Sequence, residues 1–342
     1  MRVGRVAPWT ALVAVGVVAV LTQACDDGGS SANVAEAGPS STSSAPSSLV
    51  DPAVLERGEY LVRNVAGCGE CHTPRDAQGN LDMSQWMAGV ANRFDLTPQD
   101  DSTGAISAPN LTPEHLASWT DAQIMAAFLD GVSSDGSPLF PLMPYYAYHN
   151  MTAADAAAIV TYLRALTPVG TDTPARQPLP VPLDAPAPPL DESSIPQTTL
   201  AASDSRHDSA EHGRYLAGEI GFCLDCHTPW RLGVSPPLDL TRVFAGGRPF
   251  SAHDWSIPSP APAVVYSYDL TPHASGIAGW TVDDVVAAIQ AGIVPGGAAL
   301  CRPMPSGPTG SFGGLLAQDA RDIGTYLTTL APVDGGEIPR CP

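Results

Sequence analysis

The chain has 342 residues, which is enough for two domains that each bury a core. It carries 35 acidic and 16 basic residues, for a formal net charge of -19. This charge excludes a nucleic-acid binder, because phosphate recognition needs a basic surface. An acidic surface favours solubility and suits a partner protein with a positively charged patch.

The first 25 residues have the layout of an export signal. Arg2 and Arg5 precede an apolar run at 11–21, and a small residue stands before Cys25. The run is too short to span a bilayer comfortably. Residues 21–25 resemble the end of a bacterial lipoprotein signal, in which the Cys becomes the lipidated first residue. The sequence therefore predicts export with a lipid anchor at Cys25, and ordinary secretion is the alternative.

Two further stretches are predicted to be linkers. Residues 26–50 consist mainly of Gly, Ser, Ala and Pro, so they cannot bury enough apolar surface to fold and form a disordered tether. A flexible coil of this length reaches on the order of 25 to 30 Å. Residues 168–206 are rich in Pro, which favours an extended, semi-rigid spacer that straps across a domain surface.

The pattern Cys-x-x-Cys-His occurs twice and organises the rest of the chain. Its residues are Cys68, Cys71 and His72, then Cys223, Cys226 and His227. This spacing is typical of c-type haem attachment, because two thiols can form thioether bonds to the haem vinyl groups while the adjacent imidazole binds the iron. The alternatives are a redox dithiol or half of a zinc site, but no second Cys pair lies in the same half to complete a zinc tetrahedron.

Both motifs belong to an internal repeat. The pattern Glu-x-Gly-x-Tyr-Leu precedes each of them, at 56–61 and 211–216, and apolar residues from Val54 to Val65 predict a helix that leads into the first motif and ends at Thr73. Three later segments also match between the halves. Residues 110–113 correspond to 269–272, and the predicted helix at 121–130 corresponds to the one at 282–291, with Thr N-caps at 120 and 281. The predicted closing helices are 153–166 and 317–330.

An iron that transfers electrons without binding small molecules needs a sixth ligand, and a Met thioether raises its potential. Met143 and Met304 are the candidates, because each precedes a Pro in a loop before the last helix of its half. The alternatives are core-filling Met residues and, in the first half, Met151. The possible imidazole substitutes, each more typical of a solvated surface His, are His115, His149, His253 and His273.

From about residue 53 to 332 the chain resembles tandem class I cytochrome c domains, in particular the dihaem part of the cytochrome subunits of membrane-bound alcohol and gluconate dehydrogenases. The resemblance rests on the two CxxCHTP segments, on 110–113, and on the Met-Pro loops and closing helices. It implies a mostly α fold with two tandem helical domains, 51–167 and 207–342, each wrapped around one covalently bound haem. It also implies that the motif residues bind two haem c groups and that Met143 and Met304 are the distal ligands. Those subunits have three haem motifs, whereas this chain has two.

The predicted function is that of a dihaem c-type cytochrome. It would transfer single electrons between a periplasmic or membrane dehydrogenase or quinol-oxidising complex and a terminal acceptor. We expect no catalytic residue of its own, redox proteins as partners, and a location on the periplasmic face of a bacterial membrane, where it could be a subunit of a dehydrogenase complex. The alternative is a dihaem cytochrome c peroxidase-like enzyme, which needs one iron free for peroxide; two Met ligands argue against it.

Two cysteines of the second half stand outside the motifs. Cys301 lies three residues before Met304, and Cys341 lies near the chain end. In an exported protein thiols are usually oxidised, so we predict a disulfide between them; the alternative is two independent thiols or two small buried residues. Such a bridge would keep Met304 in place, and closing a loop of about 40 residues would stabilise the fold by roughly 4 kcal/mol at most.

Overall fold

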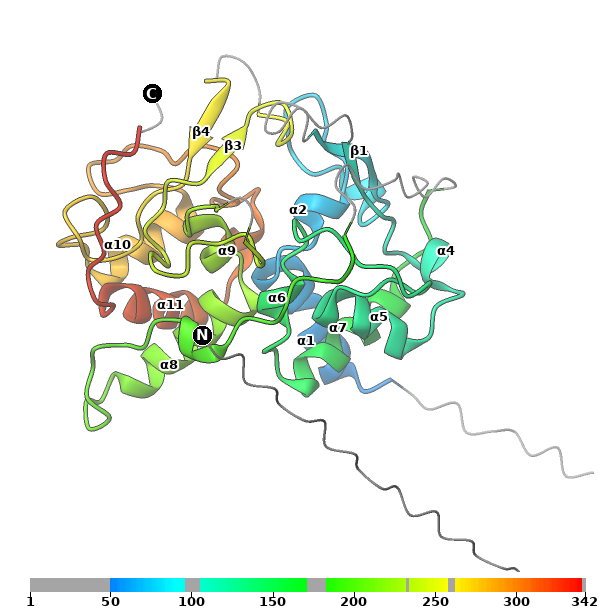
Figure 1. The fold of residues 1–342 in the computed structure, drawn as a ribbon, viewed down its shortest axis with the longest axis horizontal. Coiled ribbons are helices and arrows are strands. Elements are labelled where there is room, and N and C mark those ends of the chain that lie inside the picture. Colours follow the sequence, from blue (N-terminus) through cyan, green and yellow to red (C-terminus); the bar gives the residue numbers. More distant parts are fainter. Residues whose placement is uncertain (1–49, 96–104, 171–182, 232–233, 258–261, 340–342) are drawn as a thin grey trace, which may run out of the picture. The chain divides into compact units, whose positions relative to one another are not determined.

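The structure is a computed structural model that describes residues 50–95, 105–170, 183–231, 234–257 and 262–339 (Figure 1). The predicted export signal with Cys25, nearly all of the predicted tether, and Cys341 lie outside the described residues. The described residues belong to one compact unit, residues 49–342. We call 50–170 the first half and 183–339 the second half. The predicted domain boundaries remain predictions.

The first half is mostly helical. Its elements are α1 (Pro52–Tyr60), the π-helical η1 (Leu61–Val65), α2 (Gly69–His72), η2 (Met83–Gln85), β1 (Val90–Asp95), β2 (Ala105–Ala108), α4 (Pro113–Leu116), α5 (Asp121–Asp130), α6 (Tyr145–Tyr148) and α7 (Ala153–Ala165).

Among its described residues, the second half follows a similar order, with an additional short 3-10 helix at its start and without counterparts of η2 and α4. Its elements are η3 (Glu192–Ser194), α8 (His207–Tyr215), the π-helical η4 (Leu216–Ile220), α9 (Cys223–His227), β3 (Pro249–Ser251), β4 (Val264–Tyr266), α10 (Val282–Val286), the π-helical η5 (Ala287–Ala291), η6 (Ser311–Gly314) and α11 (Ala317–Thr328). The predicted mostly α fold class is therefore confirmed, and the helical pattern repeats along the chain.

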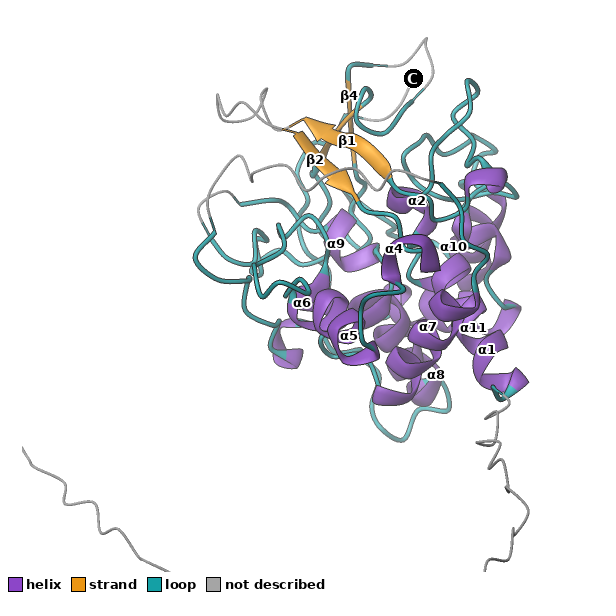
Figure 2. Cartoon of the chain, turned by 90° about the vertical axis from the view of Figure 1, so that its right-hand side faces the viewer, coloured by secondary structure: helices purple, strands orange, loops and turns teal. Residues whose placement is uncertain are grey.

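Each half also contains a short antiparallel strand pair that the sequence did not predict. β1 pairs with β2, and β3 pairs with β4. The pairs have only three to six residues per strand, so their alternation is too brief to register as a pattern. Figure 2 shows β1 and β2 at one end of the fold, with the larger helices away from them.

The two predicted Thr N-caps are confirmed. Thr120 accepts a hydrogen bond from the Gln123 backbone, and Thr281 accepts one from Asp284, each as part of a complete capping box. The stretch predicted at 121–130 forms α5, and the one at 282–291 forms α10 and η5. Both stretches end at a glycine in the left-handed conformation, which is the usual way to stop a helix.

The segment before the first motif differs in two ways from the prediction. The helix does not run unbroken to Thr73, because Gly67 has a φ of 53° and separates η1 from α2. Val54 is 36% exposed and does not share the buried face of Leu61 and Val65. The π-helical turn of η1 contains more residues than an α-helical turn, so it changes which side chains face the core. A prediction based on the α-helical period of about 3.6 residues does not include this change.

The first and last helices of each half pack closely together. α1 lies against α7, and α8 lies against α11 (Figure 1). Both contacts depend on a glycine, since a Cβ atom on Gly58 would lie 1.9 Å from the Ala158 oxygen and one on Gly213 would lie 2.0 Å from the Asp322 oxygen. Any larger side chain would separate the helix pair.

The two halves share one hydrophobic core and exchange hydrogen bonds. The Tyr60 hydroxyl of α1 donates to Asp319 of α11 at 2.5 Å, and the Tyr215 hydroxyl of α8 donates to Asp155 of α7 at 2.7 Å. The same residue types thus make the same contact in both directions, as expected when two copies of a repeat pack around an approximate two-fold axis.

The described part of the Pro-rich segment packs against both halves. Ile195 is fully buried, the Leu190 amide donates to the Tyr146 oxygen at 2.8 Å, and the Tyr326 hydroxyl donates to the Pro196 oxygen at 2.7 Å. Residues 183–206 therefore act as a strap.

Candidate haem-binding sites

The two motifs adopt the same local structure. Each forms one helical turn, so the two Cys and the His, spaced three and four residues apart, lie on one face. The Thr after each His leaves the helix in an extended conformation. Its hydroxyl accepts a hydrogen bond from a backbone amide, that of Met87 at 3.0 Å for Thr73 and that of Phe244 at 3.2 Å for Thr228.

The motif histidines are held in one orientation. Nδ1 of His72 lies 2.8 Å from the Pro109 oxygen, and Nδ1 of His227 lies 2.7 Å from the Tyr268 oxygen. A carbonyl can only accept, so Nδ1 carries the proton and Nε2 keeps its lone pair for a metal. Burial lowers the pKa of His72 and lowers that of His227 to about 4, which keeps both imidazoles neutral.

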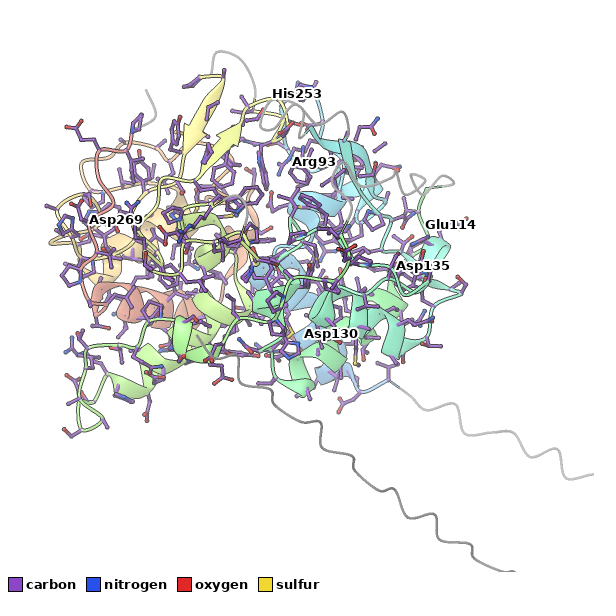
Figure 3. The ribbon with its side chains drawn as sticks, viewed as in Figure 1. Arg93, Glu114, Asp130, Asp135, His253 and Asp269 are labelled. Atoms are coloured by element: carbon purple, nitrogen blue, oxygen red, sulfur yellow. The ribbon has the colours of Figure 1, made fainter. Side chains whose placement is uncertain are left out.

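The segments at 110–113 and 269–272 explain this orientation. Asn110 and Asp269 are fully buried, and each side chain accepts the backbone amide of the Thr two residues later, at 2.8 and 2.7 Å. These turns fix the carbonyl of the residue just before them, which is the acceptor for the motif His. Asp269 is labelled in Figure 3. The repeated Leu-Thr-Pro segments therefore position the proposed iron ligands.

The motif thiols do not fit a redox dithiol. All four are free, and burial raises the pKa of Cys68 and Cys223 to about 12 and that of Cys71 to about 11. Burial also raises the pKa of Cys226. A reactive dithiol needs a lowered pKa, because the thiolate is the nucleophile. Thiols that are buried or half-buried beside a neutral imidazole suit covalent attachment of an apolar macrocycle.

A zinc site finds no support in the described part of the chain. The one group of three His, Cys or acidic side chains close enough there to share an ion is His212, Asp319 and Asp322, which contains no motif residue.

A cavity of about 220 Å³ lies beside the second motif. Cys223, Cys226 and His227 line it together with Met304, so the complete predicted donor set of this half faces one space. Much of the remaining lining is apolar and includes Phe250, Trp280, Val285, Ile289 and Leu327. Two thiols, an imidazole with a free Nε2 and a thioether around an apolar cavity are the groups that a haem c needs.

The first half contributes to the same cavity. Glu70, Cys71 and Leu142 of the first half lie on its wall with Cys226 of the second motif, so the two motifs approach each other inside the fold. His72 and Met143 do not line this cavity. Met143 is half-buried against the core, and its distal role stays a prediction, as does that of Met304.

The alternative ligands lie elsewhere. Met151 is 7% exposed within the core, where it fills space. His149 and His253 are exposed beside acidic side chains, at Asp130 and Asp254. His115 lies beside the Trp119 ring, and His273 is hydrogen-bonded to Ser275. None of the four His lines the cavity of the second motif.

Sequence analysis missed two buried arginines. Arg93, labelled in Figure 3, donates to the Glu70 backbone oxygen at 3.5 Å, and Arg248 donates to the Asp225 backbone oxygen at 2.7 Å. Each therefore holds the residue before the second Cys of its motif. A signal was present, since each Arg stands one or two residues before a Phe, between the motif and the Leu-Thr-Pro segment.

Known proteins give an independent comparison. The chain is 27% identical over 310 residues to the fructose dehydrogenase cytochrome subunit of Gluconobacter japonicus, covering 86% of this chain and 56% of that protein. It is 26% identical over 252 residues to the alcohol dehydrogenase (quinone) cytochrome c subunit of Gluconobacter oxydans, covering 71% of this chain and 48% of that one. A diheme cytochrome c-type protein of Cereibacter sphaeroides is 27% identical over 251 residues, which is 70% of this chain and 73% of that protein.

The predicted resemblance is confirmed. The chain is similar to cytochrome c subunits of dehydrogenases and to a diheme cytochrome, and it spans about half the length of the two dehydrogenase subunits. No family model matches the chain. Within the described residues, no helix has both the length and the apolar character needed to cross a bilayer.

Proposed function

We propose that this protein is a dihaem c-type cytochrome that transfers single electrons. The observation that carries the proposal is the pair of CxxCH turns, each with two free, at least half-buried thiols and a neutral His whose Nδ1 is held by a backbone carbonyl. The similarity to cytochrome c subunits and to a diheme cytochrome supports the same function.

The first site would use Cys68 and Cys71 for the thioether bonds, His72 as proximal ligand and Met143 as distal ligand. The second would use Cys223 and Cys226 for the thioether bonds, His227 as proximal ligand and Met304 as distal ligand. When bound, haem c supplies an iron that gains and loses one electron. The chain orients the two imidazoles, excludes water with its apolar walls and keeps the two sites in one unit.

The proposed partners are a dehydrogenase or a quinol-oxidising complex as donor and another redox protein as acceptor. Relatives are named as subunits of fructose and alcohol dehydrogenases, which supports a dehydrogenase on the donor side. We further propose export to the periplasmic face of a membrane and anchoring through Cys25. The acidic surface suits a partner with a basic docking patch.

Carbon monoxide titration of the reduced, haem-loaded protein tests this function. An electron carrier with two saturated irons should bind little CO and should cycle between oxidised and reduced spectra without it. Stoichiometric CO binding at one haem, with peroxide turnover, would instead favour the peroxidase-like alternative.

A further inference from the structure

The residue before the second Cys of each motif is a buried acid. Glu70 and Asp225 are both 4% exposed. A buried carboxylate is unfavourable without partners, so the groups that contact it show what the fold uses to hold it. In both motifs one of those partners comes from the other half.

Asp225 is held by Arg248 and by Tyr146. The Arg248 guanidinium forms an ion pair with the Asp225 carboxylate, and the Tyr146 hydroxyl donates to Oδ1 of the same group. Tyr146 belongs to α6 of the first half and lies three residues after Met143. It is fully buried, and burial raises its pKa well above the usual value, so the hydroxyl keeps its proton and remains a donor.

Glu70 is held in the same manner from the opposite side. Its Oε2 pairs with Arg75 at 2.5 Å. Its Oε1 accepts the Ser311 hydroxyl at 2.7 Å and the Ser311 amide at 3.2 Å. Ser311 begins η6 of the second half, in the segment that follows Met304. Each motif carboxylate is thus contacted by a hydroxyl located just past the proposed distal ligand of the other half.

We propose that Tyr146 and Ser311 are positioning residues that set the reduction potential of the haem in the opposite half. The inference rests on the proposed dihaem function. A negative charge beside a haem favours the ferric state, and in a buried site its effect is weakly screened. The donated hydroxyl disperses that charge and fixes the carboxylate. Removing the hydroxyl strengthens the negative field at that haem and lowers its potential.

The test is Tyr146→Phe in the full haem-loaded protein, with both midpoint potentials measured by spectroelectrochemistry. The potential of the second-motif haem should fall, by roughly a threefold change in its reduction equilibrium constant, or about 28 mV for a one-electron couple. The first-motif haem should not change. A separate Met143→His variant shows which of the two signals belongs to the first haem, because replacing the thioether with an imidazole shifts the potential of that haem.

Tyr145→Phe is the matched control. Tyr145 is the adjacent residue of α6 and is also fully buried, but its hydroxyl bonds to the Ala187 amide at 2.8 Å and to the Leu139 oxygen at 3.2 Å. This variant should leave the second haem's potential unchanged. Ser311→Ala provides an independent arm, and it should lower the potential of the first haem alone.

The outcomes separate the two proposals. If wild-type protein binds fewer than two haem c groups, the dihaem function fails. If two haems are bound and Tyr146→Phe and Ser311→Ala each leave the opposite haem unchanged, or move both haems equally, the positioning role is wrong.

Discussion

The two halves carry the same ligand pattern but hold the segment around the proposed distal Met by different means. After Met143 the chain enters α6, whose three tyrosines are at most 2% exposed, and the Tyr148 hydroxyl donates to the Ala66 oxygen at 3.1 Å. Before Met304, Arg302 reaches Asn80 of the first half at 2.8 Å, and Cys301 is disulfide-bonded. The predicted partner of that bridge, Cys341, lies outside the described residues.

This difference shows how a repeat diverges. The contacts that orient the motif His are the same in both halves, as the proposed role requires, because an iron ligand must have one tautomer and one direction. The segment around the proposed distal Met would only have to be kept close, and buried aromatic rings hold it in the first half, whereas a disulfide and a hydrogen bond to the other half hold it in the second. Reduction of the Cys301 disulfide should therefore leave the segment around Met143 in place and loosen the segment around Met304.

The largest expected effect comes from removing one motif. Cys223→Ala with Cys226→Ala should abolish covalent haem attachment in the second half and halve the pyridine haemochrome signal per chain. Cys68→Ala with Cys71→Ala should do the same for the first half. Heme staining of the denatured chain checks that the remaining group is covalently bound, and a variant that keeps two covalent haems would contradict the assignment.

The proposed distal ligands should give the next largest effect. Met304→Ala should remove the Met-to-iron charge-transfer absorption of one haem, and Met143→Ala that of the other. Cys301→Ser should weaken this band for the second haem alone, because it frees the loop three residues before Met304. The Cys301→Ser result would be contradicted if the band of the first haem weakened equally. Absence of the band from wild-type protein would contradict both Met assignments.

The helix contacts should respond similarly in both halves. Gly58→Ala and Gly213→Ala each place a Cβ atom within 2.0 Å of a carbonyl oxygen, so each should lower the free energy of unfolding by roughly 3 kcal/mol. Ala53→Ser, at an exposed position of the same helix as Gly58, is the control and should change it little. Denaturant unfolding measures the values. A cost confined to one half would show that the two helix pairs are not equivalent.

The smallest effect concerns a charge present in one half only. Glu219 occupies the place of Asn64 in the repeat and is 7% exposed. Burial raises its pKa to about 7, against the opposing effect of Arg214. The folded state thus binds this proton more tightly than the unfolded chain does. The contribution of Glu219 to the free energy of unfolding is therefore complete below its pKa in the unfolded chain, and it is lost as the pH rises towards 7.

Glu219→Gln removes this titration. The melting temperature of Glu219→Gln minus that of wild type should be larger at pH 8 than at pH 5. For Glu56→Gln, at an exposed site, this difference from wild type should be the same at both pH values. An equal offset of Glu219→Gln at both pH values would contradict the raised pKa.

Much of the fold could be predicted because its signals are local. The Thr120 and Thr281 caps and the closing helices depend on residues within one or two turns. The contacts of Tyr146 with Asp225 and of Ser311 with Glu70 could not be predicted, since they join residues 79 and 241 positions apart and depend on how the halves pack. The haem motifs were evident from spacing, but the carbonyls that orient their histidines required the fold.

The most direct test of the central claim is the mass of the intact wild-type chain, purified under denaturing conditions from cells that attach haem c. The account predicts the mass of the processed chain plus two haems, with one haem on the peptide that contains residues 68–72 and one on the peptide that contains 223–227. A chain that carries one haem or none, or a haem on any other peptide, would contradict it.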